Sequence, residues 1–211
     1  MNKFIIYWGD ILKYPTPDNA VENIKYDFNN TNLTLYDILN KYANLNINDK
    51  LILIIQDIYV NLKLLDIDVS IKAPFFKLAY DKKNNPIVFI CKINNNNLIV
   101  YGIDGQGILS KNQSLENYMI LNCTNRYVYN LTEINTIKIN KYLRVGRGSL
   151  LLKYLETDLI KYFNNFNSNK ILKIKGSIGN IGNINITNED RAKFYRSNNY
   201  KIKGLTFYKN L

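Results

Sequence analysis

The spacing of apolar residues changes near Pro74, and the change divides the chain into two parts. Before Pro74, apolar residues recur every three or four positions, which is the period of an amphipathic helix. Asp18 and Thr34 precede two such segments and are residue types that cap helix starts. A third segment opens with LILII, which alone also fits a buried strand, and we favour the helix. The pattern thus predicts a short strand over 3–8 and helices over 18–28, 34–42 and 51–65.

After Pro74, short apolar runs are separated by turn residues, as in β-strands. Strands are predicted over 75–80, 86–93, 98–103, 127–139, 170–175 and 200–208, with helices over 149–165 and over a short segment capped by Asn188. This order predicts an α/β (α+β) fold, in which helices flank a mixed, mostly antiparallel central sheet with an N-terminal helical extension. We expect residues 1–74 to form the extension and residues 75–211 to form the core.

The stretch from Ile137 to Phe166 joins a predicted strand to a predicted helix through a loop that contains Gly146 and Gly148. The first N–H groups of a helix have no intrahelical partner, and the helix dipole adds partial positive charge there. Glycines let an anion approach these amides, and Arg144 and Arg147 add charges suited to phosphate oxygens. The stretch is therefore a candidate diphosphate site. An ordinary strand–turn–helix connection explains the same glycines without a ligand.

The chain of 211 residues is strongly basic, with 28 Lys and Arg against 17 Asp and Glu and a formal net charge of +11. A balance of this sign suggests polyanionic partners such as nucleotides, nucleic acid or acidic proteins. The chain is also rich in Asn, Ile, Lys and Tyr, and a solvated lysine surface from a compositionally biased genome would give the same balance.

The chain has no histidine, which excludes Ser-His-Asp and Cys-His catalysis and His-containing zinc sites. Cys91 and Cys123 lie in apolar or strand-like contexts without a CxxC spacing, so we expect buried, reduced thiols and no metal site. The longest aliphatic run, 51–55, is too short to span a bilayer, and no signal peptide is evident. These features favour a cytoplasmic protein in a reducing compartment, without membrane contact.

Two separated motifs carry a family resemblance. The glycine loop reads Leu143-Arg144-Val145-Gly146-Arg147-Gly148 and leads into Ser149 and a leucine-rich helix. A later segment, RAKFYRSNNYKI, contains Phe194-Tyr195 and, after a turn, Tyr200. Together they resemble the Gln/Arg-x-x-Gly-x-Gly/Ala acyl-CoA motif and the A-x-x-FY-x-x-x-GF segment of the GCN5-related N-acetyltransferase (GNAT) superfamily.

The resemblance covers roughly residues 75–208 and departs from the family pattern at two positions. Leu143 stands where the family has Gln or Arg, with the arginine displaced by one residue to Arg144. Asn199 replaces a glycine, a mild change because asparagine tolerates a left-handed backbone.

The resemblance implies a GNAT-like fold and transfer of an acetyl group from acetyl-CoA to an amine, by direct attack of the amine on the thioester. It makes Tyr195 the candidate general acid that protonates the departing CoA thiolate. Core packing or CoA positioning is the alternative role for Tyr195. Glu133, on the strand that enters the glycine loop, is the candidate base, and a surface carboxylate is its alternative reading.

The resemblance also implies residues that bind CoA. Ile139 and Lys141 would offer backbone groups to the pantetheine arm, and Ser149 stands at the helix start. Lys141, Lys153 and Arg191 carry charges that suit the 3′-phosphate. The predicted cofactor-binding residues are Ile139, Lys141, Arg144, Val145, Gly146, Arg147, Gly148, Ser149 and Asn188.

The sequence does not specify the amine acceptor. A protein amine, a polyamine, another small molecule such as an aminoglycoside, or an aminoacyl-tRNA would each fit, and a homodimer is left open. Early elements shape the acceptor site in this family, so the same is expected of the N-terminal third. An alternative function, of a different class, is a non-catalytic basic module that binds nucleic acid or another polyanion on a GNAT-like scaffold.

Overall fold

The computed structural model describes residues 19–65, 68–94, 97–104, 117–126, 129–139, 146–166, 171–179 and 186–211. Three helices come first, α1 (Ala20–Asn29), α2 (Leu35–Tyr42) and α3 (Lys50–Leu65), as the apolar spacing predicts. α2 begins at the predicted cap, Thr34, whose side chain accepts a hydrogen bond from the N–H of Asp37. The predicted strand over 3–8 and the predicted cap Asp18 lie outside the described residues.

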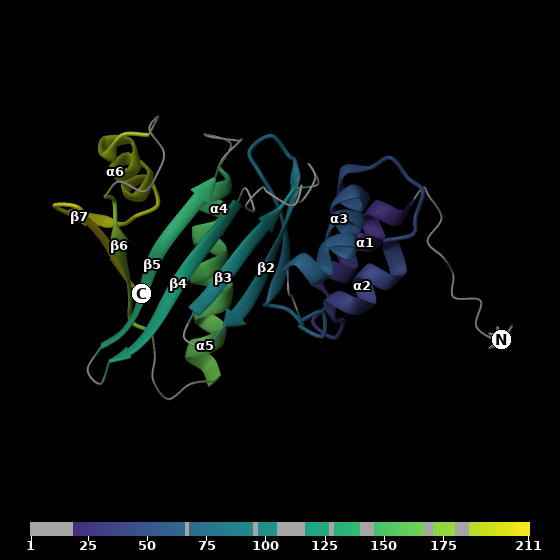
Figure 1. Ribbon diagram of the computed structural model, residues 1–211, viewed down its shortest axis with the longest axis horizontal. Helices are drawn as coiled ribbons and strands as arrows, with labels where there is room; N and C mark the ends of the chain where they lie inside the picture. The colour runs from purple at the N-terminus through teal and green to yellow at the C-terminus, as the bar shows by residue number, and fades with distance from the viewer. Residues whose placement is uncertain are drawn as a thin grey trace, which may run out of the picture.

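Eight strands form one sheet in the order β1-β2-β3-β4-β5-β6-β8-β7. An antiparallel meander is formed by β1 (Phe76–Tyr80), β2 (Pro86–Asn94), β3 (Asn97–Ile103), β4 (Asn117–Arg126) and β5 (Tyr129–Ile139). The sheet continues with β6 (Lys173–Ser177), parallel to β5, and closes with the hairpin of β7 (Lys201–Lys203) and β8 (Thr206–Asn210). The predicted fold class is confirmed, including the mixed, mostly antiparallel sheet and the N-terminal helical extension (Figure 1).

Two parts of the sheet differ from the prediction. β4 lies in a segment where the sequence pattern predicts no strand, because NYMILNCTNR places three apolar residues in a row among asparagines and hides the two-residue period. The predicted strand over 200–208 is instead the β7–β8 hairpin, since Gly204 takes φ +58 where the chain reverses. Asn199 has φ +65, which confirms the expected left-handed backbone.

The helical segment after the glycine loop has three parts, α4 (Arg147–Tyr154), the π-helical turn η2 (Leu155–Leu159) and α5 (Ile160–Phe166). The last helix, α6 (Asn188–Ser197), is capped by Thr187 and not by Asn188. The Thr187 hydroxyl accepts from the N–H of Asp190 at 3.1 Å, and the Asp190 carboxylate accepts from the N–H of Thr187 at 3.2 Å. The predicted cap is therefore wrong by one residue.

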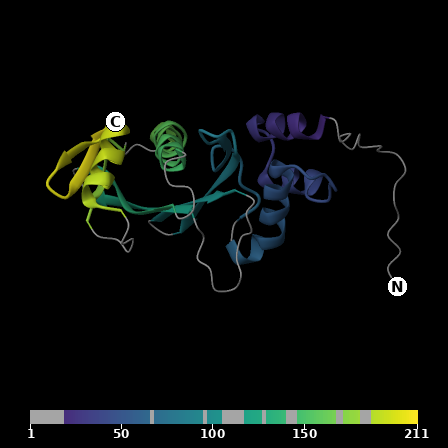
Figure 2. The ribbon, with the colours of Figure 1, turned by 90° about the horizontal axis from the view of Figure 1, so that it is seen from above.

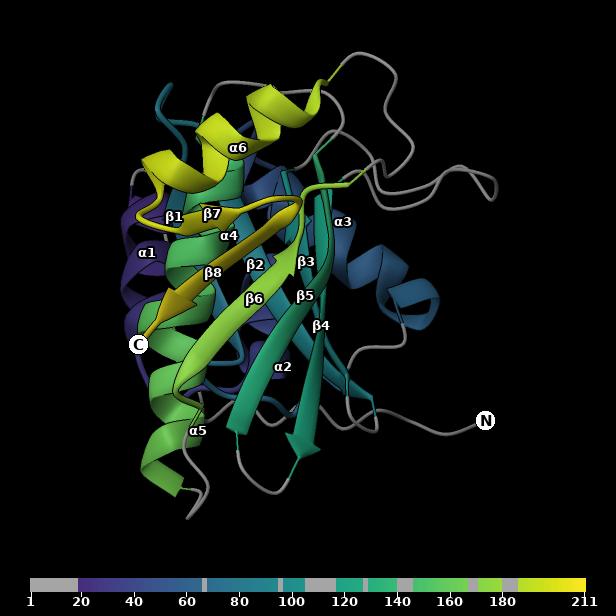
Figure 3. The same cartoon turned by 90° about the vertical axis from the view of Figure 1, so that its left-hand side faces the viewer.

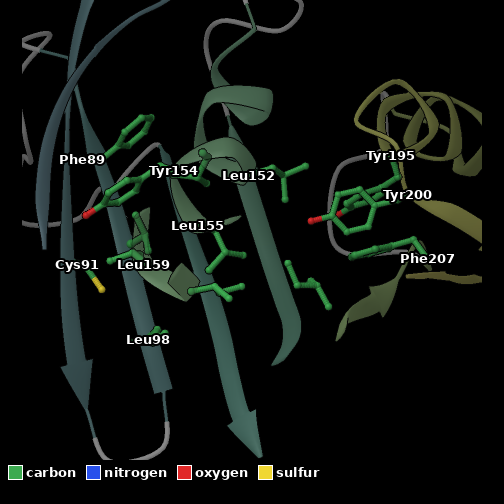
Figure 4. Packing of buried hydrophobic residues seen from close by; sticks show 14 of the residues in the cluster. Phe89, Cys91, Leu98, Leu152, Tyr154, Leu155, Leu159, Tyr195, Tyr200 and Phe207 are labelled. Carbon is green, nitrogen blue, oxygen red and sulfur yellow. The ribbon is translucent and has the colours of Figure 1, made fainter. Parts of the chain in front are cut away.

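Both faces of β2 are covered by helices. Ile87, Phe89 and Cys91 pack in a C-terminal core, which we define as the buried residues shared by α4, η2, α6, β6, β8 and one face of β2 and β3 (Figure 4). Val88 and Ile90 pack in an N-terminal core with α1, α2 and α3. Successive strand side chains point to opposite faces, so the unbroken apolar run IVFIC suits a strand buried on both sides.

The two cores give the molecule its arrangement. Figure 2 shows α1–α3 gathered at one end and the C-terminal elements at the other, with α4 between them. Phe76 and Ile103, from the sheet, belong to the N-terminal core together with the helices. The predicted division at residues 74 and 75 stays a prediction. No helix among the described residues combines the length and apolar character needed to cross a membrane.

Candidate functional site

Strands β5 and β6 separate at the end of the sheet toward which both run. The last pair joins Ile134 to Gly176, although β5 continues to Ile139. At the same point the register between β4 and β5 shifts, which leaves Asn135 without an opposite residue in β4. A bulge of this kind bends a strand and interrupts its pairing. Figures 1 and 3 place the start of α4 and helix α6 at this end of the sheet.

Helix α4 begins at the glycine loop without a side-chain cap. Gly146 is the N-cap residue and has φ +88, a left-handed conformation that favours glycine. The N–H of Leu150 donates to the Gly146 carbonyl oxygen at 3.0 Å, so the N–H groups of Gly148 and Ser149 precede the helical ladder. The first turn holds no acidic residue. This helix start therefore has the geometry and partial charge that suit an anionic ligand.

The turn between β1 and β2 lies against the same helix start. A Cβ atom at Gly146 would lie 3.0 Å from Cγ and 3.2 Å from Cε of Lys82. The aliphatic stem of Lys82 therefore runs close over Gly146 and brings an ammonium group to this side of α4. The sequence pattern did not single out Lys82.

Arg147 is buried, with 4% of its side chain exposed. Its Nε donates to the Asp81 carboxylate at 3.4 Å, and its Nη1 pairs with the Asp104 carboxylate. A phosphate contact from this guanidinium, as the sequence predicts, would have to displace two carboxylates. Sequence reasoning missed both Asp81 and Asp104.

Asp81 ties the β1–β2 turn to this buried arginine. Its carboxylate accepts from the N–H of Lys83 at 2.8 Å and from the N–H of Asn85 at 3.0 Å. Burial alone would raise the pKa of Asp81, but these donors, the Asn85 side chain and the Arg147 charge together hold that pKa below its ordinary value. The ionised carboxylate therefore anchors Arg147, and with it the start of α4, to the sheet.

Tyr195, the predicted general acid, is buried in the C-terminal core on α6. Its ring stacks on Phe207 with centroids 3.6 Å apart and meets Phe194 and Tyr200 edge-on. Figure 4 shows Tyr195, Tyr200 and Phe207 grouped beside Leu152 of α4. Burial raises the pKa of Tyr195, and the charge of Arg191 opposes that rise only in part. Within the described residues, no side chain or backbone group hydrogen-bonds the Tyr195 hydroxyl.

The neighbouring Tyr200 has a different environment. Its hydroxyl donates to the Glu156 carboxylate at 2.7 Å, and Lys209 donates to the other carboxylate oxygen at 2.6 Å. Burial, and then the bond to Glu156, raise the pKa of Tyr200. The network holds α6 and β8 against the helix that follows the glycine loop, and sequence reasoning did not predict it.

The other predicted site residues fall in three groups. The backbones of Glu133 and Ile139 lie in β5, and Glu133 is in register with Lys175 of β6, but their side chains are not described. Asn188 begins α6, where its side chain accepts from Arg191, and Arg191 also donates to the Gly179 carbonyl oxygen at 3.0 Å. Lys141, Arg144 and Val145 lie outside the described residues.

Among the described residues, no three Cys, Asp or Glu side chains lie close enough together to bind a metal ion. Cys91 is buried in the C-terminal core.

Comparisons with known proteins show a weak likeness to solved structures. No protein-family model matches the chain, and no curated protein matches it. Among solved structures, the chain is similar to an acetyltransferase of the GNAT family from Listeria monocytogenes 4b F2365, with 11% sequence identity and a TM-score of 0.33. The match covers 55% of this chain and 64% of that one. A likeness this distant supports no conclusion about activity.

Proposed function

We propose that this protein is a GNAT-type N-acetyltransferase that moves an acetyl group from acetyl-CoA to an amine acceptor. The observation that carries the proposal is the start of α4, where Gly146 opens the helix without a side-chain cap at the end of the sheet where β5 leaves β6. The N–H groups of Gly148 and Ser149 would bind the CoA diphosphate.

The β5 edge supports a second contact with the cofactor. Beyond Ile134, the edge of β5 that faces β6 has no described pairing partner. A pantetheine arm carries amides in an extended chain, and such a chain can add to a strand edge through main-chain hydrogen bonds. Ile139, at the end of β5, would belong to this contact. Lys141 would follow it, as the sequence predicts.

Tyr195 would supply the proton that the chemistry requires. The amine nitrogen attacks the thioester carbonyl, the C–S bond breaks, and the departing thiolate takes a proton from the Tyr195 hydroxyl. Burial raises the pKa of this phenol, so Tyr195 is protonated at neutral pH and is a weaker acid than an exposed tyrosine. The amine proton would pass to Glu133 or to water, and solvent would restore the tyrosine.

The first test is binding of CoA. CoA should raise the melting temperature of the protein, since a ligand at about a hundredfold above its Kd stabilises the native state by about 2.7 kcal/mol. Gly148→Val should abolish this protection by blocking approach to the amides. Gly204→Val, in a turn with open space around it, should keep it. Absence of CoA protection in the unmodified protein would refute the proposal and favour the non-catalytic polyanion-binding alternative.

The second test separates catalysis from binding. Tyr195→Phe should lower the acetyl-transfer rate by about 10²-fold or more while CoA affinity stays nearly unchanged, because only the proton donor is removed. Tyr200→Phe provides the control, since it removes a neighbouring hydroxyl that already donates to Glu156. An unchanged rate in Tyr195→Phe would return Tyr195 to a packing role.

A further inference from the structure

The outer face of the last three strands carries lysines around one tyrosine. We call it the lysine face, and it consists of Lys173 and Lys175 of β6, Tyr208 of β8, and Lys201 and Lys203 of β7. These residues alternate along their strands with inward residues such as Ile174 and Phe207, which are fully buried in the C-terminal core. The five side chains therefore share the opposite face.

The register between the strands places these five residues next to one another. Tyr208 lies between Lys175 on one side and Lys201 on the other, so these two lysines are about 10 Å apart across two strand spacings. The Lys173 ammonium lies 4.8 Å from the centre of the Tyr208 ring. Lys203 continues the row of Lys201 along β7. Figure 3 looks toward these strands, with β6 and β8 in front of α4.

No carboxylate balances this charge within the three strands. Residues 170–179 and 200–211 contain no Asp or Glu. Among the described residues, none of the four lysines forms an ion pair. The neighbouring strand, β5, carries an acidic residue, Glu133, which is in register with Lys175. An anion that spans β6, β8 and β7 would therefore meet only positive side-chain charge on these three strands.

We propose that the lysine face binds single-stranded nucleic acid, with phosphates against the lysines and a base stacked on Tyr208. An aromatic ring surrounded by cations is the arrangement that such proteins use on exposed sheet surfaces. A lipid surface would need apolar side chains to insert, and of the five residues of the lysine face only Tyr208 is apolar. Leu172 and Leu205 are exposed at the ends of these strands, so lipid vesicles are one arm of the test. The lysine face lies on the opposite side of the strands from Tyr195, while Glu133, the candidate base, is in register with Lys175 on the neighbouring strand. The nucleic-acid test below therefore measures binding alone and uses no acetyl transfer.

One structural explanation competes with it. β7 is the edge strand of the sheet, and charged residues on an edge strand prevent pairing with another molecule. A positive or a negative charge can serve this protective role equally well. Binding to nucleic acid needs positive charge, and a charge reversal therefore separates the two explanations.

The test uses the full chain and a fluorescent uridine oligonucleotide of about twelve residues, followed by anisotropy at several salt concentrations. Four phosphate contacts predict a slope of about −3 for log K against log salt. The double substitution Lys175→Glu with Lys201→Glu should weaken binding about tenfold or more and roughly halve the slope. Tyr208→Ala should weaken binding about tenfold with little change in slope, and Tyr208→Phe should restore it.

The matched control reverses two exposed lysines elsewhere, Lys72→Glu with Lys161→Glu, which changes the net charge equally. Equal weakening in both double variants would show attraction by overall charge only and would overturn the proposal. Equal affinity for a duplex of the same length, or for phosphatidylserine vesicles, would overturn the assignment to single strands. If Lys175→Glu with Lys201→Glu lowers the melting temperature, Lys175→Gln with Lys201→Gln gives the same comparison with smaller repulsion, and an unchanged affinity there would refute the proposal.

Discussion

Three helix starts in this protein differ in what satisfies their first amides. α2 and α6 begin with the same capping box, Thr34 with Asp37 and Thr187 with Asp190, in which hydroxyl and carboxylate exchange hydrogen bonds with the backbone. α4 begins at Gly146, with no side-chain cap and no acidic residue in its first turn. The capped starts need no ligand, whereas the α4 start has no side-chain cap, and under the proposed function an anion takes that place.

The start of α4 is anchored by the side chain of its first residue. Arg147, its first residue, reaches into the protein and pairs with Asp81 and Asp104, from the β1–β2 turn and the end of β3. The helix is thus anchored through a side chain while its amides stay outside that contact. A capping box fixes a helix start through hydrogen bonds to its first amides. The Arg147 ion pairs fix the start of α4 through a side chain instead.

The largest effect should come from removing that anchor. Arg147→Leu removes the guanidinium that pairs with the buried carboxylate of Asp81 and the partly buried carboxylate of Asp104, and breaking a buried ion pair costs about 3–5 kcal/mol. Urea unfolding should show this loss. Arg196→Leu breaks an exposed pair with Glu189 and should cost less than about 1 kcal/mol.

A further variant tests the reason for that loss. Arg147→Leu combined with Asp81→Asn and Asp104→Asn should recover part of the stability, because the uncompensated charges are gone. Equal stability losses in Arg147→Leu and Arg196→Leu would contradict the anchor.

Gly146 offers the next comparison, with Gly204 as its partner. Both have positive φ, +88 and +58, so alanine at either position should cost about 1–2 kcal/mol from the backbone alone. At Gly146 a Cβ would also press against Lys82 at 3.0 Å, whereas nothing lies within 4 Å at Gly204. Chemical denaturation should therefore show the larger loss for Gly146→Ala, and CoA protection should weaken only there.

Lys82→Ala measures the close approach at Gly146 directly. In a double-mutant cycle it should remove the additional loss in Gly146→Ala and leave the backbone cost behind. Additive losses would mean that the Lys82 stem simply moves aside.

How far the sequence predicts this site depends on the range of the contacts. Features set by neighbouring residues are predicted correctly. The apolar period predicts α1–α3, Thr34 marks the start of α2, and an asparagine in place of the usual glycine predicts the left-handed backbone at position 199. The Thr187 cap was equally local, since Thr-x-x-Asp is a capping signature, and the prediction chose the adjacent Asn188 instead. The Gly204 turn was likewise visible in the sequence. Both errors, at the α6 cap and at the Gly204 turn, arose where two neighbouring residues allowed different predictions.

The anchor of α4 could not be predicted in the same way. Arg147 is 66 residues from Asp81 and 43 from Asp104, and no periodic pattern joins them. Beside glycines that suit a phosphate, an arginine favours a ligand contact on sequence grounds alone. Only the sheet, which brings the β1–β2 turn and the end of β3 to the glycine loop, shows that carboxylates take that place.

The smallest effect concerns the capped starts and their dependence on pH. The Thr34 hydroxyl and N–H donate to the Asp37 carboxylate, which holds the pKa of Asp37 below its ordinary value. A carboxyl whose folded pKa is lowered stabilises the protein above its unfolded pKa, and that stabilisation is lost as pH falls through the folded pKa. Thr34→Ala should cost about 1 kcal/mol at neutral pH, and this cost should shrink below about pH 4. Stability curves at pH 7 and pH 3 would measure the change. CoA protection at neutral pH should be unaffected, because the capped start of α2 binds no ligand, and a loss of protection in Thr34→Ala would remove the distinction between capped and uncapped helix starts.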